Sequence, residues 1–337
     1  MCGSLPGSTA VQIFILISTL LTKSPFISYI AFFAFCLMSS LVLLFLGTLV
    51  RDYVQDENTL PVQLRLVFLG FKAAGAGIIF SRLIHNVSLK KQDQNLFKIS
   101  IMLGTTILYF YFRSTACIEA CLFFGGVLSL YVETDVKKKM NEQTRQVMKS
   151  MSKYSILFGS FSTYLLLGIY LILWLVFKFH PQSPYVYCGI FYFVACFIFG
   201  PASTIFAFLF AYFSESQLMT PEQFWLGVPL AYLLPGTSIN IAVYYGTLID
   251  GARGALLAWV CIYLPAFLSV YGILPDWYLY RDRPGIQRLL IGVSCVSSGL
   301  ALASVQTYQH VDSHAAVALH GSGRGRHCRS IHNHGLL

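Results

Sequence analysis

The segment "LLPGTSIN" places a helix break beside three polar side chains inside a long apolar stretch. Pro235 and Gly236 cost about 3 and 1 kcal/mol within a helix, and in lipid the backbone groups that they free must find partners. Thr237, Ser238 and Asn240 follow at once. Amides at the start of a helix favour an anion, and hydroxyl and amide side chains add donors. The pattern predicts an anion-binding site, and a structural kink absorbed by neighbouring helices is the alternative.

Three other residues are candidates for the same site. Gly200 and Pro201 interrupt another apolar run, where they bring backbone close to the site or form a packing notch. Lys72 lies about eleven residues into a third run. A charge inside a membrane is expensive and is a functional hypothesis by default. Lys72 would balance a dianion, pair with Glu119 or extend its ammonium group to the membrane surface.

The composition indicates an all-α, polytopic membrane protein. The chain has 337 residues, of which 56% are hydrophobic and 11% charged, against about 25% charged in soluble domains. The apolar runs are continuous rather than alternating, which favours helices over a barrel. The formal charge of +9 lies in short loops and the tail, so we expect no nucleic-acid partner. The nine cysteines form no C-x-x-C pair, and we expect neither a metal site nor a disulfide framework.

Ten apolar segments follow one another along the chain. By residue number they are 10–22, 26–50, 62–84, 97–112, 114–132, 154–179, 186–213, 224–249, 253–275 and 286–308. The fourth and fifth read as a helical hairpin around Arg113. The eighth contains the break, and at about 1.5 Å per residue it is still long enough to cross a membrane.

Basic loops orient these segments. The loops 85–98 and 133–153 are rich in lysine, which places both in the cytoplasm. The arginines at 281, 283 and 288 fall on the same side if segment 224–249 crosses once. Charge therefore favours a broken, crossing helix there rather than a re-entrant hairpin.

The chain also contains an internal repeat. "SLPGSTAVQI" at 4–13 matches "LLPGTSINIA" at 233–242, and "RLVFLGFKAAGAGII" at 65–79 matches "QRLLIGVSCVSSGLA" at 287–301. Internal repeats with matching helix breaks point to a transporter whose site lies near the membrane midplane. The loop assignments make the two repeats inverted. The counterpart of the second break comprises Pro6, Gly7, Ser8 and Thr9.

The stretch "FYFVACFIFGPASTIFAFLFAYFSESQLMTPEQFWLGVPLAYLLPGTSINIAVYYGTLIDGARGALLAWVCIYLPAFL" resembles the chromate ion transporter family. The matching motifs are Phe199-Gly200-Pro201, the loop from Glu222 to Trp225, Pro235-Gly236-Thr237 with Asn240, and Leu264-Pro265-Ala266-Phe267-Leu268. The resemblance covers most of residues 4–308. It implies a two-repeat transporter of chromate, with sulfate as a related dianion. The family's opening helices and first Phe-Gly-Gly motif have no counterpart here, and Ser8 and Thr237 replace the last proline of Pro-Gly-Pro.

Four regions follow from these observations. We expect an N-terminally incomplete first transporter repeat at 1–132, a basic cytoplasmic linker at 133–153, a second repeat at 154–308 and a disordered His- and Arg-rich tail at 309–337. A metal-binding tract is the alternative for the tail.

The function that we expect is transport of chromate, with sulfate, by alternating access. A transporter or channel for another small solute, and a truncated, non-transporting membrane subunit, are the alternatives. No G-x-x-x-x-G-K-[ST] motif occurs, and nothing in the sequence favours an enzyme or a cofactor. The partners are a small inorganic oxyanion and the lipid bilayer, and a homo-oligomer is compatible with the pattern. We expect a multi-pass protein of the plasma membrane, with an organelle membrane as the alternative.

Overall fold

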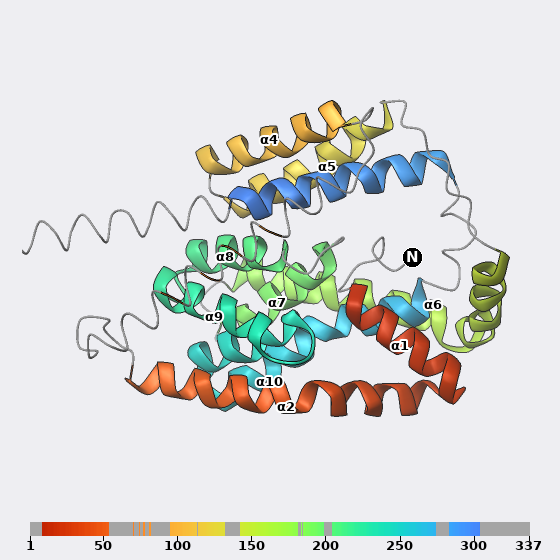
Figure 1. The fold of residues 1–337 in the computed structure, drawn as a ribbon, viewed down its shortest axis with the longest axis horizontal. Helices are drawn as coiled ribbons and strands as arrows, with labels where there is room; N and C mark the ends of the chain where they lie inside the picture. The colour runs from red at the N-terminus through yellow and green to blue at the C-terminus, as the bar shows by residue number, and fades with distance from the viewer. Residues whose placement is uncertain are drawn as a thin grey trace, which may run out of the picture.

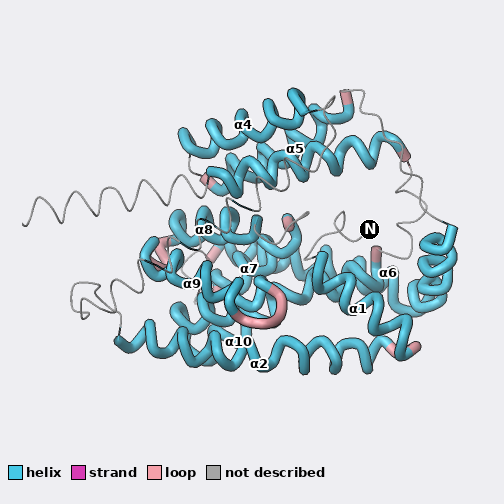
Figure 2. The backbone as a smooth tube through the Cα atoms, viewed as in Figure 1, coloured by secondary structure: helices cyan, strands magenta, loops and turns pink. Residues whose placement is uncertain are grey.

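The computed structural model describes only part of the chain. The described residues are 9–53, 95–112, 114–131, 142–180, 183, 185–198, 204–273 and 283–303, with the single positions 70, 74, 77 and 81. All regular elements among them are helices, which confirms the all-α prediction (Figure 2).

The helices are shown in chain order in Figure 1. They are α1 (Thr9–Thr22), α2 (Pro25–Tyr53), α4 (Asn95–Phe112), α5 (Thr115–Leu130), α6 (Glu142–Phe179), α7 (Val186–Phe197), α8 (Thr204–Ser216), α9 (Pro221–Leu233), the 3-10 helix η4 (Ser238–Asn240), α10 (Ile241–Gly272) and a last helix, Pro284–Ala303. Three described helices are long and apolar enough to cross a membrane, namely Phe26–Asp52, Ser238–Gly272 and Pro284–Ala303.

α10 is bent into two arms at Asp250 and Gly251. Asp250 has φ −139° and ψ 30°, and Gly251 has φ 60° and ψ −147°. A positive φ is available to glycine at little cost. We refer to 241–249 as the short arm and 252–272 as the long arm. The short arm spans about 14 Å at 1.5 Å per residue, which is too short to cross a hydrocarbon core of about 30 Å.

α9 and the short arm form an antiparallel hairpin, so the prediction of a crossing helix at 224–249 was wrong. The rings of Phe224 and Tyr245 are stacked, with centroids 4.9 Å apart. Tyr244 donates from its hydroxyl to the carbonyl of Gln223 at 3.1 Å. A Cβ on Gly227 would lie 2.7 Å from the ring of Tyr244. The paired residues lie at nearly equal distances in sequence before and after Pro235-Gly236, as expected for a hairpin that turns there. The absence of a side chain at Gly227 lets Tyr244 pack closely against α9.

The predicted span 186–213 is also two helices, α7 and α8. They contact each other, and the rings of Phe191 and Phe213 lie 5.6 Å apart. With 12 and 13 residues, each helix reaches about 18–20 Å. α8 and α9 in turn pack antiparallel about their connecting loop, since Phe210 contacts Trp225 and Phe206 contacts Tyr232. The four short helices therefore run alternately up and down.

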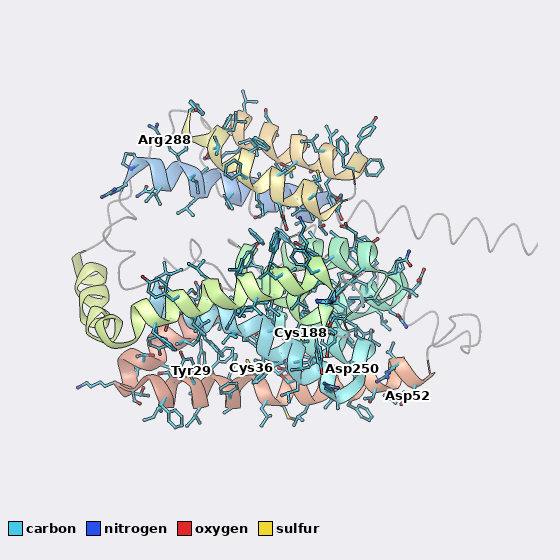
Figure 3. All side chains as sticks on the ribbon, turned by 180° about the vertical axis from the view of Figure 1, so that it is seen from behind. Tyr29, Cys36, Asp52, Cys188, Asp250 and Arg288 are labelled. Atoms are coloured by element: carbon cyan, nitrogen blue, oxygen red, sulfur yellow. The ribbon has the colours of Figure 1, made fainter. Side chains whose placement is uncertain are left out.

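α2 lies against both arms of α10, and its direction is opposite to that of the long arm. At one end Tyr29 contacts Tyr271, with ring centroids 5.6 Å apart. At the other end a Cβ on Gly251 would collide with the guanidinium of Arg51. Figure 3 shows this order, with Tyr29, Cys36 and Asp52 along α2 and Asp250 toward the Asp52 end.

α4, α5 and the last helix form a second group, at the top of Figure 1. Thr106 donates to the carbonyl of Gly299 at 3.0 Å, and Ser129 donates to the carbonyl of Arg288 at 2.7 Å. α4 ends at Phe112 and α5 begins at Thr115, and the two contact each other. The prediction that these two helices form a hairpin is thus confirmed, and Arg113 itself lies outside the described residues.

Candidate functional site

The tip of the α9–α10 hairpin, residues 234–240, lies against the middle of α2. Asn240 donates from Nδ2 to Oγ of Ser39 at 2.5 Å. Ser39 is the central residue of α2 (Pro25–Tyr53), with fourteen residues on either side. α2 is the longest of the described candidate spans outside α10. The tip therefore lies level with the middle of a helix that is long enough to cross a membrane.

The backbone of the tip is built by one proline, one glycine and a short 3-10 turn. α9 ends at Leu233, where the Leu234 N–H bonds to the carbonyl of Leu230 at 3.3 Å. Gly236 then adopts φ +124°, a conformation that other residues rarely take. A Cβ there would lie 3.0 Å from Oγ of Ser39 and 3.2 Å from Nδ2 of Asn240. Glycine thus allows the tip to approach α2 closely.

The polar side chains of the tip join a hydrogen-bonded cluster with the long arm. Tyr263 donates from its hydroxyl to Oδ1 of Asn240 at 2.5 Å. Oγ1 of Thr237 lies 2.5 Å from the same tyrosine hydroxyl. Cys36 of α2 is buried one turn before Ser39, and its carbonyl accepts from the Ser39 hydroxyl at 3.0 Å. Asn240 and Tyr263 are 2% and 1% exposed, and their bonds are therefore made without competition from water.

The predicted site residues that the structure describes differ in how far they are buried. Pro235 and Gly236 are exposed at the tip, Thr237 and Ser238 are half-buried, and Asn240 is buried. The structure brings these five together in one turn of chain. Thr9 is the first residue of α1. The remaining predicted residues lie outside the described part of the chain: Pro6, Gly7, Ser8, Lys72, Gly200 and Pro201.

Ser39 and Tyr263 belong to the cluster and were not predicted from the sequence. Ser39 carries a weak signal, because it is a polar residue at the centre of a 29-residue apolar helix. Tyr263 carries none, since it is one of 20 tyrosines. Its role depends on the bend at Gly251, which folds the long arm back alongside the tip.

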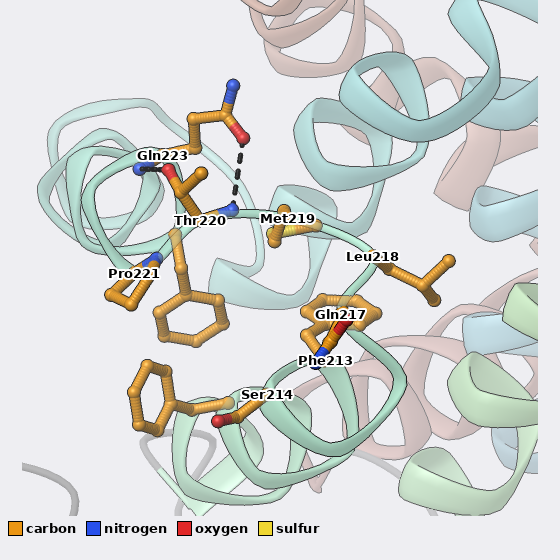
Figure 4. A pocket seen from close by; sticks show the side chains of 10 residues that line it. Phe213, Ser214, Gln217, Leu218, Met219, Thr220, Pro221 and Gln223 are labelled. Carbon is orange, nitrogen blue, oxygen red and sulfur yellow. Dashed lines mark hydrogen bonds between the residues drawn. The ribbon is translucent and has the colours of Figure 1, made fainter.

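A cavity of about 470 Å³ lies at the loop between α8 and α9 (Figure 4). Its walls include Phe213, Phe224 and Gln217. Thr220 caps α9 by accepting from the Gln223 N–H at 3.3 Å, and the Gln223 side chain accepts from the Thr220 N–H at 3.2 Å. These reciprocal bonds fix the loop. The cavity is at the end of the hairpins opposite the tip, so it is separate from the polar cluster.

In the part of the chain that the structure describes, no group of three or more His, Cys, Asp or Glu side chains is arranged to hold a metal ion. The chemistry of the tip is that of neutral hydrogen-bond donors and acceptors in an apolar surrounding. Such a site suits a ligand that is recognised by hydrogen bonds to its oxygen atoms.

Comparison with known proteins identifies the family. Neither a curated protein nor a solved structure matches this sequence. The sequence profile of the chromate transporter family matches residues 1–130 and 185–322. These two matches contain α1, α2, α4 and α5 on one side and α7 to α10 with the last helix on the other, and both hairpin breaks of the second half. The chain is an integral membrane protein and belongs to the chromate transporter family.

Proposed function

We propose that this chain moves chromate and sulfate across the membrane by alternating access, and that the tip of the α9–α10 hairpin binds the anion. One observation carries the proposal, namely the contact between Asn240 and Ser39 at the centre of α2. A polar turn at mid-membrane is costly unless it is used or fully bonded. Substrate sites of transporters lie at this depth, where a helix is interrupted.

The polarity of the tip favours an anion. Thr237, Ser238 and Asn240 all lie on the η4 side of the turn, and the α9 side contributes Leu233 and Leu234. The first amides of a helix have no partner within it and carry a partial positive charge of about half an elementary charge. The polar side chains and the first helix amides thus belong to the same side of the turn, and an oxyanion accepts hydrogen bonds through all its oxygens.

The arrangement of the helices supports an inverted repeat. In each half a short helix follows Leu-Pro-Gly, a residue with positive φ makes the bend, and a long helix follows. The bend residues are Lys23, with φ 54°, and Gly251, with φ 60°. α2 and the long arm are the two long helices, and they run in opposite directions. In this scheme Pro6, Gly7, Ser8 and Thr9 form the corresponding half of the site, since α1 packs its Phe14 on Phe35, near the centre of α2.

The other predicted residues complete the proposed site. The end of α7 and the start of α8 are at the same end of the short helices as the turn at Pro235-Gly236, and we assign Gly200 and Pro201, which lie outside the described residues, to the site from the sequence pattern. Lys72 would supply a charge to balance the dianion.

Contacts between helix ends also support the charge-based topology. Arg51 meets Gly251, and the Thr115 N–H donates to the Glu215 carboxylate at 3.0 Å. With cytoplasmic loops at 85–98 and 133–153 and hairpins at 186–213 and 224–249, all four residues fall on the outside, whereas the predicted crossing at 186–213 would have placed Glu215 inside. The hairpins at 186–213 and 224–249 replace two predicted crossings of the membrane. Because two crossings are removed together, the arginines near 283 stay on the cytoplasmic side. The plasma membrane is the location that we propose, and a homo-oligomer is compatible with the exposed apolar helices.

Uptake of labelled chromate and sulfate into cells that express the chain tests the proposal. The variant is Gly236→Ala, since any side chain there is strained and crowds Ser39 and Asn240. The control is Gly168→Ala in α6, where a Cβ would meet nothing within 4 Å. We expect uptake that depends on the chain, is lost in Gly236→Ala and is retained in Gly168→Ala at equal abundance. Equal uptake in both variants would contradict the site, and no uptake with the unaltered chain would favour a subunit or another solute.

A further inference from the structure

The polar cluster at the tip is a hydrogen-bond chain with a single direction. The Ser39 hydroxyl donates to the carbonyl of Cys36 at 3.0 Å, so its oxygen accepts from Asn240. Oδ1 of Asn240 accepts from the hydroxyl of Tyr263. Because Tyr263 has one hydroxyl proton, its contact with Thr237 is donated by the threonine.

The residues of this hydrogen-bond chain are all buried except Thr237, which stands at its head. Ser39 and Cys36 are 2% and 0% exposed, and Asn240 and Tyr263 are equally buried. Thr237 at the head of the chain is only half-buried. An anion that reaches the exposed turn at Pro235-Gly236 therefore meets Thr237 first.

The hydrogen-bond chain connects three separate elements of the fold. Thr237 and Asn240 belong to the tip, Tyr263 to the long arm and Ser39 to α2. Hydrogen bonds in an apolar interior strengthen one another. The hydrogen-bond chain therefore holds the tip against both α2 and the long arm. The long arm and α2 belong to the two different matches of the family, and the chain thus spans the two halves at mid-membrane.

We propose that Tyr263 and Ser39 are positioning residues for the oxyanion site: they hold Thr237 and Asn240 in a closed hydrogen-bonded chain, which an oxyanion opens by taking the hydrogen bond that Thr237 donates to Tyr263. The inference rests on the proposed function of the tip. The threonine hydroxyl needs only to rotate about its Cβ–Oγ bond in order to donate to the anion instead. Tyr263 keeps its own donated bond to Asn240, and the tip loses one of its two direct ties to the long arm.

Cys36 provides a probe of the closed state that does not depend on transport. Cys36 is fully buried, and its carbonyl accepts from Ser39 of the cluster, so its thiol reacts with a maleimide only when the tip moves away from α2. The experiment uses the full-length chain in which the eight other cysteines are alanine, reconstituted in liposomes. N-ethylmaleimide is the reagent, and sulfate is the oxyanion because chromate oxidises thiols.

The variants are Tyr263→Phe and Ser39→Ala, and the control is Tyr271→Phe. Tyr271 is buried on the same long arm, but its hydroxyl contacts Thr19 rather than the tip. We expect Tyr263→Phe and Ser39→Ala to raise the rate of Cys36 labelling about tenfold, which corresponds to about 1.4 kcal/mol, and Tyr271→Phe to leave it unchanged. Sulfate should raise the rate in the unaltered protein and add nothing in Tyr263→Phe.

Two results would overturn the inference, and they differ from each other. If Tyr263→Phe and Ser39→Ala label like Tyr271→Phe, the chain does not close the tip, whatever sulfate does. If the variants behave as expected but sulfate leaves the unaltered protein unchanged, the closed chain is retained and the oxyanion assignment of the tip is wrong.

Discussion

Nδ2 of Asn240 lies 2.5 Å from Oγ of Ser39, although the two residues are 201 positions apart in the sequence. The contact joins the turn of a short helical hairpin to the centre of a full-length helix. Since both side chains are buried, loss of either one leaves a polar partner without its bond, at a cost of about 1–3 kcal/mol. The position of the tip against the centre of α2 depends on this contact and on the glycine that permits it.

The hairpin arrangement predicts that the loop after α8 and the bend of α10 open to the same side of the membrane. Single cysteines at Gln217 and Ala252, both exposed, should react with a membrane-impermeant maleimide from one side only, and from the same side. A cysteine at Lys23, at the opposite end of α2, should react from the other side. Labelling of positions 217 and 252 from opposite sides would contradict the hairpin and support a helix that crosses the membrane at 224–249.

Gly227 should tolerate no side chain, because its Cβ would lie 2.7 Å from the ring of Tyr244 and 3.0 Å from that of Tyr245. We expect Gly227→Ala to lower stability by about 1–3 kcal/mol, as overpacking does, and to lower the thermal unfolding temperature in detergent. Gly104→Ala in α4, where a Cβ would meet nothing within 4 Å, is the matched control. Equal unfolding temperatures would show that α9 and the short arm do not pack as described.

The bend of α10 should require glycine for its backbone rather than for space. Gly251→Ala is expected to cost about 1–3 kcal/mol, because φ 60° with ψ −147° is almost restricted to glycine. The guanidinium of Arg51 also occupies the space of a Cβ, but it is the end of a flexible side chain. The double variant Arg51→Ala, Gly251→Ala should therefore unfold like Gly251→Ala alone. Recovery of stability in the double variant would mean that the collision was the cause.

The sequence predicts where the hairpins turn but not that they are hairpins. Pro235 and Gly236 mark a break by their own conformational preferences, and the same holds for Gly200 and Pro201. A break does not determine the direction of the next helix. That direction follows from contacts such as the one between Gly227 and Tyr244, which no local pattern encodes. Continuous hydropathy over 186–213 therefore concealed two helices.

The candidate site, too, was predicted only in part from the sequence. Thr237, Ser238 and Asn240 were predicted because they follow the break directly. Ser39 and Tyr263 lie far away in the sequence, and only the bend at Gly251 and the packing of α2 bring them to the tip. Side chains that complete a site from other helices cannot be recognised from one sequence without its tertiary contacts.

The packing of α5 against α8, which joins the two helix groups, should depend on a hydrogen bond between Glu119 and Tyr212. Tyr212 donates from its buried hydroxyl to the Glu119 carboxylate at 2.8 Å. Tyr212→Phe should lower stability by about 1–3 kcal/mol, as for a hydrogen bond to a charged group. Glu119→Gln keeps an acceptor and should cost less, and the thermal unfolding temperatures of the two variants measure the difference. A larger loss in Glu119→Gln would show that the carboxylate charge has another role.

Equilibrium binding of labelled sulfate to the purified protein tests the central claim most directly. The variant is Asn240→Ala, which removes the donor to Ser39 and the acceptor of Tyr263, and the control is Thr106→Ala, which removes a buried hydroxyl between α4 and the last helix. We predict saturable binding to the unaltered protein and to Thr106→Ala, and affinity at least about tenfold weaker in Asn240→Ala, or about 1.4 kcal/mol. Equal affinity in folded Asn240→Ala would contradict the assignment of the hairpin tip as the oxyanion site.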